Sequence, residues 1–323
     1  MQYQRLRGTG ATVSRLSLGA MTFGAQTDEA TAKRIIDSAL YAGINFIDTA
    51  DVYVGGVSEE IVGRALKGKR NKVVLDSKVR GLTGEDMYKD EGLHRWHIIH
   101  GVEASLKRLG VDCLDICYMH RPDRNTPIEE TLAAFDSLVQ QGKVMYVGMS
   151  NFSSWRICRA KWVADVGRYP PPVVTQVPYN LLARGIEEEL LPFTCEMDVG
   201  VTCYNPLAAG LLTGKHRKTM QPIENTRFSL SHNYYNRYWM DSNITAVETL
   251  ASIAEKAGKT LLELALQWLL AQSTIDYVIF GVSQLEHLEQ NVQADEGALD
   301  AETLAACDEV WATLRGDYFR YNR

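Results

Sequence analysis

Long apolar runs are absent from the sequence, and its first ten residues, MQYQRLRGTG, are largely polar. A membrane-spanning helix needs about 20 mostly apolar residues in succession. A secretory signal needs an apolar segment behind a basic start. We therefore expect a cytoplasmic chain with no membrane partner.

Cysteine is scarce and follows no ligand pattern. The six cysteines include no CxxC pair, which is a spacing used by structural zinc sites. Disulfide frameworks are typical of small secreted domains, whereas 323 residues can bury a large core without such links. We expect six free thiols in a reducing compartment and no metal site.

Positive charge is in deficit. The formal net charge is -6 and the sequence pI is about 5.7, which argues against nucleic acid as the main partner. A phosphorylated small ligand remains compatible, since a few local cations suffice to bind it. The chain also lacks a glycine-rich phosphate turn after its first apolar run, which disfavours an open doubly wound sheet.

Short apolar runs alternate with longer segments of helical periodicity along almost the whole chain. Strands that alternate with helices must be parallel and buried on both faces. Eight such units predict a closed (β/α)8 TIM barrel, which can use this length as the single domain 1–323. The expected strands are 15–21, 44–48, 72–78, 113–120, 144–150, 172–177, 199–204 and 276–281.

Two segments fall outside this alternation. The N-terminal QYQRLRGTGATVSRL has polar–apolar alternation around a Gly-Thr-Gly turn, which predicts a short β-hairpin that closes the barrel floor. The stretch 214–241 is polar and aromatic, and a loop this long is usually functional or mobile. Its Tyr234, Tyr235, Tyr238 and Trp239 fit a packed loop, or a lid and substrate wall.

The active site of such a barrel lies at the C-terminal ends of its strands. Any one polar residue there has an ordinary structural explanation, but together they form a coherent acid–base site. The residues at these ends are Asp48, Tyr53, Lys78, His120, Ser150, Asn151, Gln176, Tyr204, Gly281 and Ser283.

Four of these residues suggest a proton-transfer chemistry. An ammonium such as Lys78 stabilises a phenolate and pulls down the pKa of Tyr53. Asp48 can supply the counter-charge that keeps Lys78 protonated, and His120 can orient a substrate oxygen. Tyr53 could then protonate a developing alkoxide while hydride reaches carbon. Since no side chain delivers hydride, a nicotinamide or flavin must do so.

Seven segments together resemble the aldo-keto reductase superfamily, in that family's order and from Gly19 to Asn291. They are NFIDTADVY, LDSKV, YMHRPD, VGMSNF, TQVPYN, YNPLAAGLLTGKH and VIFGVSQLEHLEQN. The resemblance implies a barrel that binds NADPH without a Rossmann domain and reduces a small-molecule carbonyl. It also implies a catalytic tetrad of Asp48, Tyr53, Lys78 and His120, with Tyr53 as the general acid.

The resemblance further implies how the cofactor is held. Tyr204 would stack on the nicotinamide, whose carboxamide would bind the polar ends of two strands, and further residues would follow the dinucleotide outward. The implied residues are Met21, Asp48, Ser150, Asn151, Gln176, Tyr204, Pro206, Leu207, Ala208, Lys215, Arg227, Gly281, Ser283, His287, Gln290 and Asn291.

Three departures from the family pattern bear on these expectations. Relatives often have Arg or Lys near Ser283 for the 2′-phosphate, and here Ser283 and Gln284 stand alone. Relatives often have Gln at His287. NADH is therefore not excluded, although Lys215 and Arg227 could compensate. Val54 follows Tyr53 where many relatives have Gly, which alters the loop only.

Two other function classes remain open. Lys78 could form a Schiff base in a class I aldolase-type lyase. The chain could instead be a cofactor-binding regulatory subunit with low turnover, since some family members serve ion channels. The sequence also leaves open which aldehyde, ketone, quinone or keto-sugar is reduced, and whether the chain forms a homo-oligomer.

Overall fold

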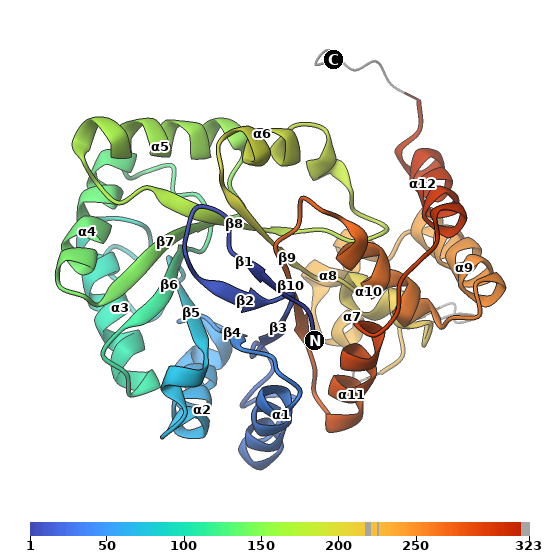
Figure 1. Cartoon of the computed structure of the whole chain (residues 1–323). Helices are drawn as coiled ribbons and strands as arrows, with labels where there is room; N and C mark the ends of the chain where they lie inside the picture. Colours follow the sequence, from blue (N-terminus) through green and yellow to red (C-terminus); the bar gives the residue numbers. More distant parts are fainter. Residues whose placement is uncertain (217–220, 225, 318–323) are drawn as a thin grey trace.

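A closed barrel of parallel strands forms the centre of the computed structural model, which describes residues 1–216, 221–224 and 226–317 (Figure 1). The predicted (β/α)8 barrel is confirmed, in strand order β10-β3-β4-β5-β6-β7-β8-β9. Its strands are β3 (Leu16–Gly19), β4 (Phe46–Asp48), β5 (Val74–Val79), β6 (Leu114–Met119), β7 (Val144–Ser150), β8 (Pro172–Pro178), β9 (Gly200–Tyr204) and β10 (Tyr277–Gly281).

Helices surround the barrel wherever the sequence has 3.6-residue periodicity. In α1, for example, Ile35 and Ile36 are fully buried, and Asp28 caps the helix by accepting from the Thr31 amide at 3.0 Å. The helices of the described residues are α1 (Glu29–Tyr41), α2 (Val57–Leu66), α3 (Arg95–Leu109), α4 (Ile128–Gln140), α5 (Ser154–Gly167), α6 (Leu190–Glu196), α7 (Arg227–Leu230), α8 (His232–Tyr238), α9 (Asp241–Lys256), α10 (Leu261–Ala271), α11 (Leu285–Ala294) and α12 (Ala301–Arg315).

The strands bury both of their faces, as their apolar composition predicts. Outward residues such as Leu18, Val201 and Phe280 pack against the helices in the larger core. Inward residues such as Phe46 and Tyr277 fill the lower half of the barrel in a separate core. The barrel is therefore packed at one end, and any cavity must lie toward the other.

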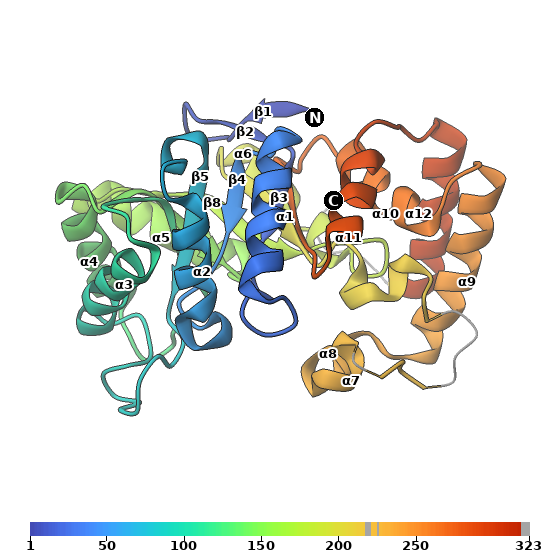
Figure 2. The same cartoon turned by 90° about the horizontal axis from the view of Figure 1, so that it is seen from below.

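The predicted hairpin is present as β1 (Tyr3–Arg5) and β2 (Thr12–Ser14), paired antiparallel. Its Leu6 and Val13 are fully buried in the inner core, so the hairpin closes the barrel floor, as expected. Figure 2 shows β1 and β2 at one end of the molecule and α7 and α8 at the opposite end.

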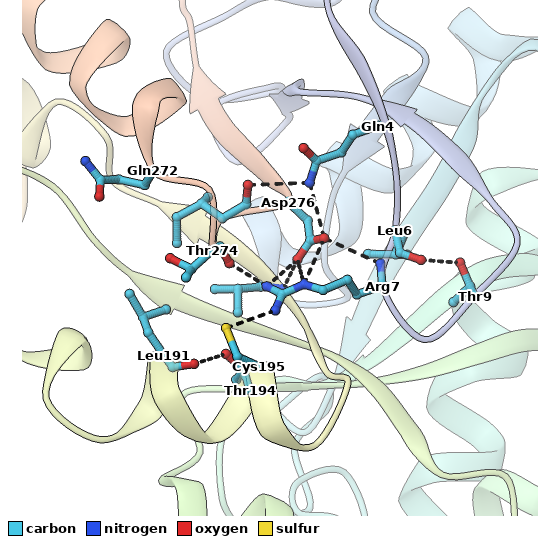
Figure 3. A network of polar contacts seen from close by, with 12 residues as sticks. Gln4, Leu6, Arg7, Thr9, Leu191, Thr194, Cys195, Gln272, Thr274 and Asp276 are labelled. Atoms are coloured by element: carbon cyan, nitrogen blue, oxygen red, sulfur yellow. Dashed lines mark hydrogen bonds and ion pairs between the residues drawn. The ribbon is translucent and has the colours of Figure 1, made fainter.

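An ion pair fixes the hairpin to the barrel (Figure 3). The Arg7 guanidinium donates to both carboxyl oxygens of Asp276, with Nη2–Oδ2 at 2.9 Å. The Val201 amide and Gln4 Nε2 also donate to Asp276, at 2.6 and 3.2 Å. Asp276 precedes β10 and is almost fully buried, so its charge needs these partners.

The stretch 214–241 folds in part as α7 and α8, while 217–220 and 225 lie outside the described residues. The described part of the chain contains no helix long and apolar enough to cross a membrane. In the same part no group of three or more His, Cys, Asp or Glu side chains is arranged to hold a metal ion.

Candidate active site

A cavity of about 940 Å³ opens at the C-terminal ends of the strands. Inward-facing positions alternate along each parallel strand, so the last inward residue of each strand reaches this cavity. These residues converge from far apart in the chain, as the sequence predicts. Asp48, His120, Ser150, Gln176 and Tyr204 all contribute to the lining.

A buried ion pair lies at the base of the cavity. Lys78 Nζ donates to Asp48 Oδ1 at 2.6 Å and to the Thr49 carbonyl at 2.7 Å, and Gln176 Nε2 donates to the same Asp48 oxygen at 2.8 Å. Lys78 is 1% exposed and does not itself line the cavity. Burial opposes its charged form, but Asp48 and Tyr53 outweigh this and raise the pKa of Lys78. Lys78 is thus held as an ammonium.

Tyr53 lies directly above this ion pair at the start of a 3-10 turn, η1 (Tyr53–Gly56). Lys78 Nζ is 4.9 Å from the centroid of the Tyr53 ring. We expected Lys78 to lower the pKa of the phenol. Burial is the larger effect and raises the pKa of Tyr53, with Lys78 opposing it only in part. The hydroxyl therefore stays protonated at rest, which a proton donor requires.

His120 completes the predicted tetrad. Its ring meets that of Tyr53 edge-on, with centroids 5.9 Å apart. Burial, and then the positive charges of Lys78, Arg121 and Arg80, lower the pKa of His120 to about 3. The imidazole is therefore neutral near pH 7, so it can donate or accept a hydrogen bond but carries no charge to a substrate oxygen.

The residues expected around the nicotinamide form one hydrogen-bonded group. The Tyr204 hydroxyl donates to Asn151 Oδ1 at 2.8 Å, and Asn151 Nδ2 donates to Ser150 Oγ at 3.0 Å and to the His120 carbonyl at 3.2 Å. Asn151 adopts a left-handed conformation with φ 64°, which Asn tolerates better than most residues. This turn ties the ends of three strands together at the cavity wall.

Two cations lie along the outer part of the cavity. Lys215 and Arg227 both line it, and burial followed by the charge of Arg227 lowers the pKa of Lys215. Two like charges held close together, with no acidic partner among the described residues, favour an anionic ligand between them. Nearby Pro206 and Leu207 line the cavity as expected, but Ala208 does not: its side chain is fully buried, and Ala209 lines the wall instead.

The far end of the cavity brings together the residues expected near the adenosine. Gly281, Ser283, His287, Gln290 and Asn291 lie there, together with Met21 at the nearer rim. Buried Asn291 leaves its Oδ1 without a hydrogen-bond partner in the described part of the chain. An unsatisfied buried polar atom in a cavity wall indicates a place for a polar ligand.

Sequence reasoning missed part of this lining. The first turn of α10 reaches the cavity, where Thr260 and Glu263 form a capping box. The pattern Thr-Leu-Leu-Glu marked a helix start, but not one close to the strand ends. Missed lining residues include Thr22, Gln26, Asn205, Thr213, Thr226, Arg237, Thr260, Leu262, Glu263 and Gln293.

Part of the aromatic cluster in the 214–241 stretch forms a packed loop, and part of it forms a wall of the cavity. Tyr238 is buried, and Trp239 packs between His216 and Phe228, so most of the cluster is a packed loop. Tyr234 alone lines the cavity, with its hydroxyl 3.9 Å from Met21 Sδ on the opposite rim.

Residues 15–312 match the family model described as "Aldo/keto reductase family". The chain belongs to this family. The family generally uses a nicotinamide cofactor, and the match supports an oxidoreductase, in agreement with the resemblance found in the sequence.

Individual relatives carry two kinds of name. A "Probable voltage-gated potassium channel subunit beta" from Arabidopsis thaliana is 39% identical over 301 residues, covering 91% of each chain. The "Uncharacterized oxidoreductase YrpG" of Bacillus subtilis is 37% identical over 98% of each chain. A "Putative voltage-gated potassium channel subunit beta" from Schizosaccharomyces pombe is 35% identical, covering 95% of this chain and 92% of that protein.

Proposed function

We propose that this protein is an NADPH-dependent reductase that converts an aldehyde or ketone into the alcohol. The observation that carries the proposal is Tyr53 at the cavity wall, above the Lys78 ammonium that Asp48 and the Thr49 carbonyl hold in place. A phenol kept protonated by burial and backed by a fixed positive charge is a suitable general acid.

Each residue of the site has a defined part in this reaction. The nicotinamide, when bound, would supply hydride to the carbonyl carbon. Tyr53 gives its proton to the carbonyl oxygen, and Lys78 stabilises the phenolate that remains until solvent returns a proton. Neutral His120 donates a hydrogen bond that orients the carbonyl oxygen. In sum, one hydride and one proton are added across the C=O bond.

The cavity fits a phosphorylated dinucleotide. It reaches from Tyr204 to Asn291 and is lined by Lys215 and Arg227, for which the described residues provide no salt-bridge partner. Within the same part of the chain, buried side-chain atoms of Asn205 and Asn291 have no hydrogen-bond partner. We propose NADPH rather than NADH because Arg227 lies beside Gly281, with its Nη2 3.8 Å from where a Gly281 Cβ would be. That position adjoins Ser283, where a 2′-phosphate is expected.

The cofactor preference is tested by titrating the purified protein with NADPH and NADH and following nicotinamide fluorescence. We expect NADPH to bind more tightly and Arg227→Gln to remove most of the difference. The matched control is Arg34→Gln, an exposed arginine on α1 outside the cavity. Equal affinities for both cofactors would contradict the choice of NADPH.

The reaction is tested by NADPH oxidation with a panel of aldehydes, ketones, quinones and keto-sugars. We expect turnover with at least one carbonyl class, lost by a factor of about 10²–10⁴ in Tyr53→Phe with cofactor binding retained. Tyr41→Phe is the control, since Tyr41 is 96% exposed on α1. Full activity of Tyr53→Phe would overturn the assignment of the general acid.

A regulatory subunit is the second candidate, because two of the relatives above are named as potassium channel beta subunits. In that case the chain would hold NADPH tightly and turn it over slowly while bound to a membrane channel. Single-turnover oxidation of bound NADPH that stays slow with every carbonyl, with no product release, would favour this candidate over the enzyme.

A Schiff-base lyase is disfavoured by the state of Lys78. Its ammonium is buried, donates to Asp48 and Thr49, and has a raised pKa. An amine nucleophile needs the opposite, namely a lowered pKa. Borohydride trapping of a substrate on Lys78 would reverse this conclusion.

We further propose a cytoplasmic protein that unfolds as a single domain of residues 1–323. All six cysteines are free in the structure, as a reducing compartment favours. One cooperative thermal transition and an unchanged melting temperature after addition of a reductant would support both statements. Two separate transitions would contradict the single domain.

We also propose a homodimer through the outer face of α5. Trp155, Trp162 and Val166 on this face are 57%, 65% and 69% exposed, which is unusual for large apolar side chains on one stripe. In an antiparallel pairing of two copies, Trp155 would face Val166 of the partner copy.

Light scattering after gel filtration tests this dimer. We expect the native protein at the mass of two chains and Trp162→Glu at the mass of one. Trp96→Glu is the control, because Trp96 is 58% exposed on α3 rather than α5. A native monomer, or a Trp162→Glu dimer, would contradict the proposed interface.

A further inference from the structure

A second carboxyl lies beneath the catalytic ion pair. Asp76 is on β5, two residues before Lys78, so both side chains face the barrel interior. In the sheet register Asp76 is directly opposite Asp48 of β4. Its side chain is 0% exposed, and no hydrogen-bond donor among the described residues satisfies either of its carboxyl oxygens.

The hydrogen bonds of Asp48 leave one of its two carboxyl oxygens free to accept from Asp76. Both side-chain donors, Lys78 Nζ and Gln176 Nε2, bind the same oxygen, Oδ1. The other oxygen, Oδ2, receives no donor from the described residues. Asp76 is the cross-strand partner of Asp48, so its carboxyl is placed next to that of Asp48 and could donate to Oδ2. Two carboxyls can share such a hydrogen bond only when one of them carries a proton.

The surroundings of Asp76 contain too little positive charge for two carboxylates. Among the described residues, Lys78 is the single cation that acts on it, and the Thr49 amide donates to the backbone carbonyl of Asp76 rather than to its side chain. Burial first, and then the negative charge of Asp48, raise the pKa of Asp76 well above its ordinary value. The other titratable groups that feel its charge are the fully buried Tyr118 of β6, Tyr277 of β10 and Cys117 of β6.

We propose that Asp76 is a positioning residue of the active site: it holds a proton at neutral pH and donates it to Oδ2 of Asp48. Asp48 is then held by three donors, and the Asp48–Lys78–Asp76 group carries no net charge. Lys78 is not neutralised by a second carboxylate, so its positive charge acts on Tyr53.

The protonated Asp76 should also affect the rate of carbonyl reduction, and this prediction rests on the proposed function. When Tyr53 gives up its proton, the phenolate depends on Lys78 for stabilisation. Loss of the Asp76 proton would add a buried negative charge below Lys78 and disfavour that phenolate. Carbonyl reduction should therefore slow as pH rises through the pKa of Asp76.

Infrared spectroscopy tests the proton directly and needs no catalytic activity. We expect the native protein near pH 7 to show protonated-carboxyl C=O absorption that is reduced in Asp76→Asn. Asp51, whose pKa is about 7, accounts for what remains, and this remainder should be lost in Asp51→Asn. Asp112→Asn, at an exposed position outside the barrel, should keep the full absorption. Undiminished absorption in Asp76→Asn, or its absence from the native protein, would overturn the proposal.

Kinetics test the positioning role. We expect Asp76→Leu to lower kcat about tenfold with KM little changed, since it removes a donor to Asp48. Asp76→Asn keeps a donor, so it should restore most of the rate and lack the alkaline decline caused by Asp76. An alkaline limb identical in native protein and Asp76→Asn would overturn the role. If no variant reduces any carbonyl, the proposed function fails, while the infrared band still decides the state of Asp76.

Discussion

The two ends of the barrel treat buried charge differently. At the floor, both oxygens of the Asp276 carboxylate are saturated by Arg7, Val201 and Gln4. At the mouth, Asp76 lacks a donor and Lys78 is surrounded by three acidic groups. Left-handed non-glycine residues are also more frequent at the mouth, where Val54, Asn151 and Ala209 have φ of 52°, 64° and 57°. At the floor side they include Arg168 before β8 and Asp198 before β9, with φ of 56° and 49°.

The difference separates stability from chemistry. The Arg7–Asp276 ion pair at the floor has both of its carboxyl oxygens filled by donors, so its role is to fix the hairpin to the barrel. Incompletely satisfied groups and strained residues cost stability and persist at sites where ligands and protons are handled. Substitutions at the floor should therefore alter unfolding alone, and those at the mouth should alter the reaction as well.

The largest effect is expected for Lys78→Met at the mouth. It removes the charge that stabilises the Tyr53 phenolate, so NADPH oxidation should fall by about 10²-fold or more. It also leaves Asp48 buried without its cation, which costs about 3–5 kcal/mol of unfolding free energy. Stopped-flow nicotinamide fluorescence and urea unfolding measure the two effects.

Its control is Lys72→Met, since Lys72 is exposed near the floor end of β5. That variant should match the native protein in both measurements. If Lys78→Met kept the native rate, this would contradict the claim that buried charge at the mouth serves the reaction.

The next effect is expected for Arg7→Met at the floor. Asp276 would lose its cation while it stays almost fully buried. The free energy of unfolding should fall by about 2–4 kcal/mol, while kcat and cofactor affinity remain native. Urea unfolding and steady-state kinetics check this outcome.

Arg5→Met provides the matched control in the same hairpin, because Arg5 is exposed and, among the described residues, its side chain donates only to the Thr9 carbonyl. It should cost far less stability than Arg7→Met. A tenfold loss of kcat in Arg7→Met would show that the floor also serves the chemistry.

A smaller effect, dependent on pH, is expected for Asp51→Asn behind the mouth. Burial and then Glu59 raise the pKa of Asp51 to about 7, against an ordinary value of 3.8. Between pH 3.8 and about pH 7 the folded state therefore binds more protons than the unfolded state. The contribution of Asp51 to the free energy of unfolding is fully present below the unfolded pKa and is lost as pH rises through about 7.

Asp51→Asn removes that loss. Relative to the native protein, the variant should gain up to about 2 kcal/mol of unfolding free energy between pH 5 and pH 8. Guanidinium titrations at the two pH values measure the gain, with Asp112→Asn as the exposed control. A difference between variant and native protein that is equal at both pH values would contradict the shifted pKa.

The smallest effect is expected for Val54→Gly in the turn after Tyr53. Val54 is β-branched and left-handed, with φ 52°, which is unfavourable by about 1–2 kcal/mol. Glycine relieves this strain but adds freedom to the unfolded chain, so the net gain should be about 0.5–1 kcal/mol. Val52→Gly, at φ -88° in the same turn, should instead destabilise the protein. Thermal unfolding of both variants decides whether the turn is strained.

Much of the fold was predictable because it follows from periodicity. Continuous apolar runs identified the eight parallel strands, and helical spacing such as Ile35–Ala39 identified the faces that cover them. The hairpin was predictable from the alternation that places Leu6 and Val13 on one side. Polar residues ending apolar strands likewise predicted Asp48, Lys78 and His120, because a barrel brings strand ends together.

Other parts depended on contacts that spacing does not encode. Thr260 begins a helix far along the chain, and only the packing of α10 brings it to the cavity. Ala208 was expected at the cavity, but in the left-handed turn at Ala208 and Ala209 the first side chain is fully buried and the second lines the cavity. Asp76 stood inside an expected strand, and nothing in the sequence indicated which carboxyl would lie opposite it.

By itself the sequence determined the order of strands and helices, the closed barrel and the side chains at its mouth. These follow from local periodicity and from the rule that parallel strands end at the same side of the barrel. The tertiary structure alone decided the protonation states. Burial raises the pKa of Tyr53 despite Lys78, lowers the pKa of His120 and raises the pKa of Asp76. A pKa depends on desolvation and on charges brought close by folding, and neither can be read from residues in order.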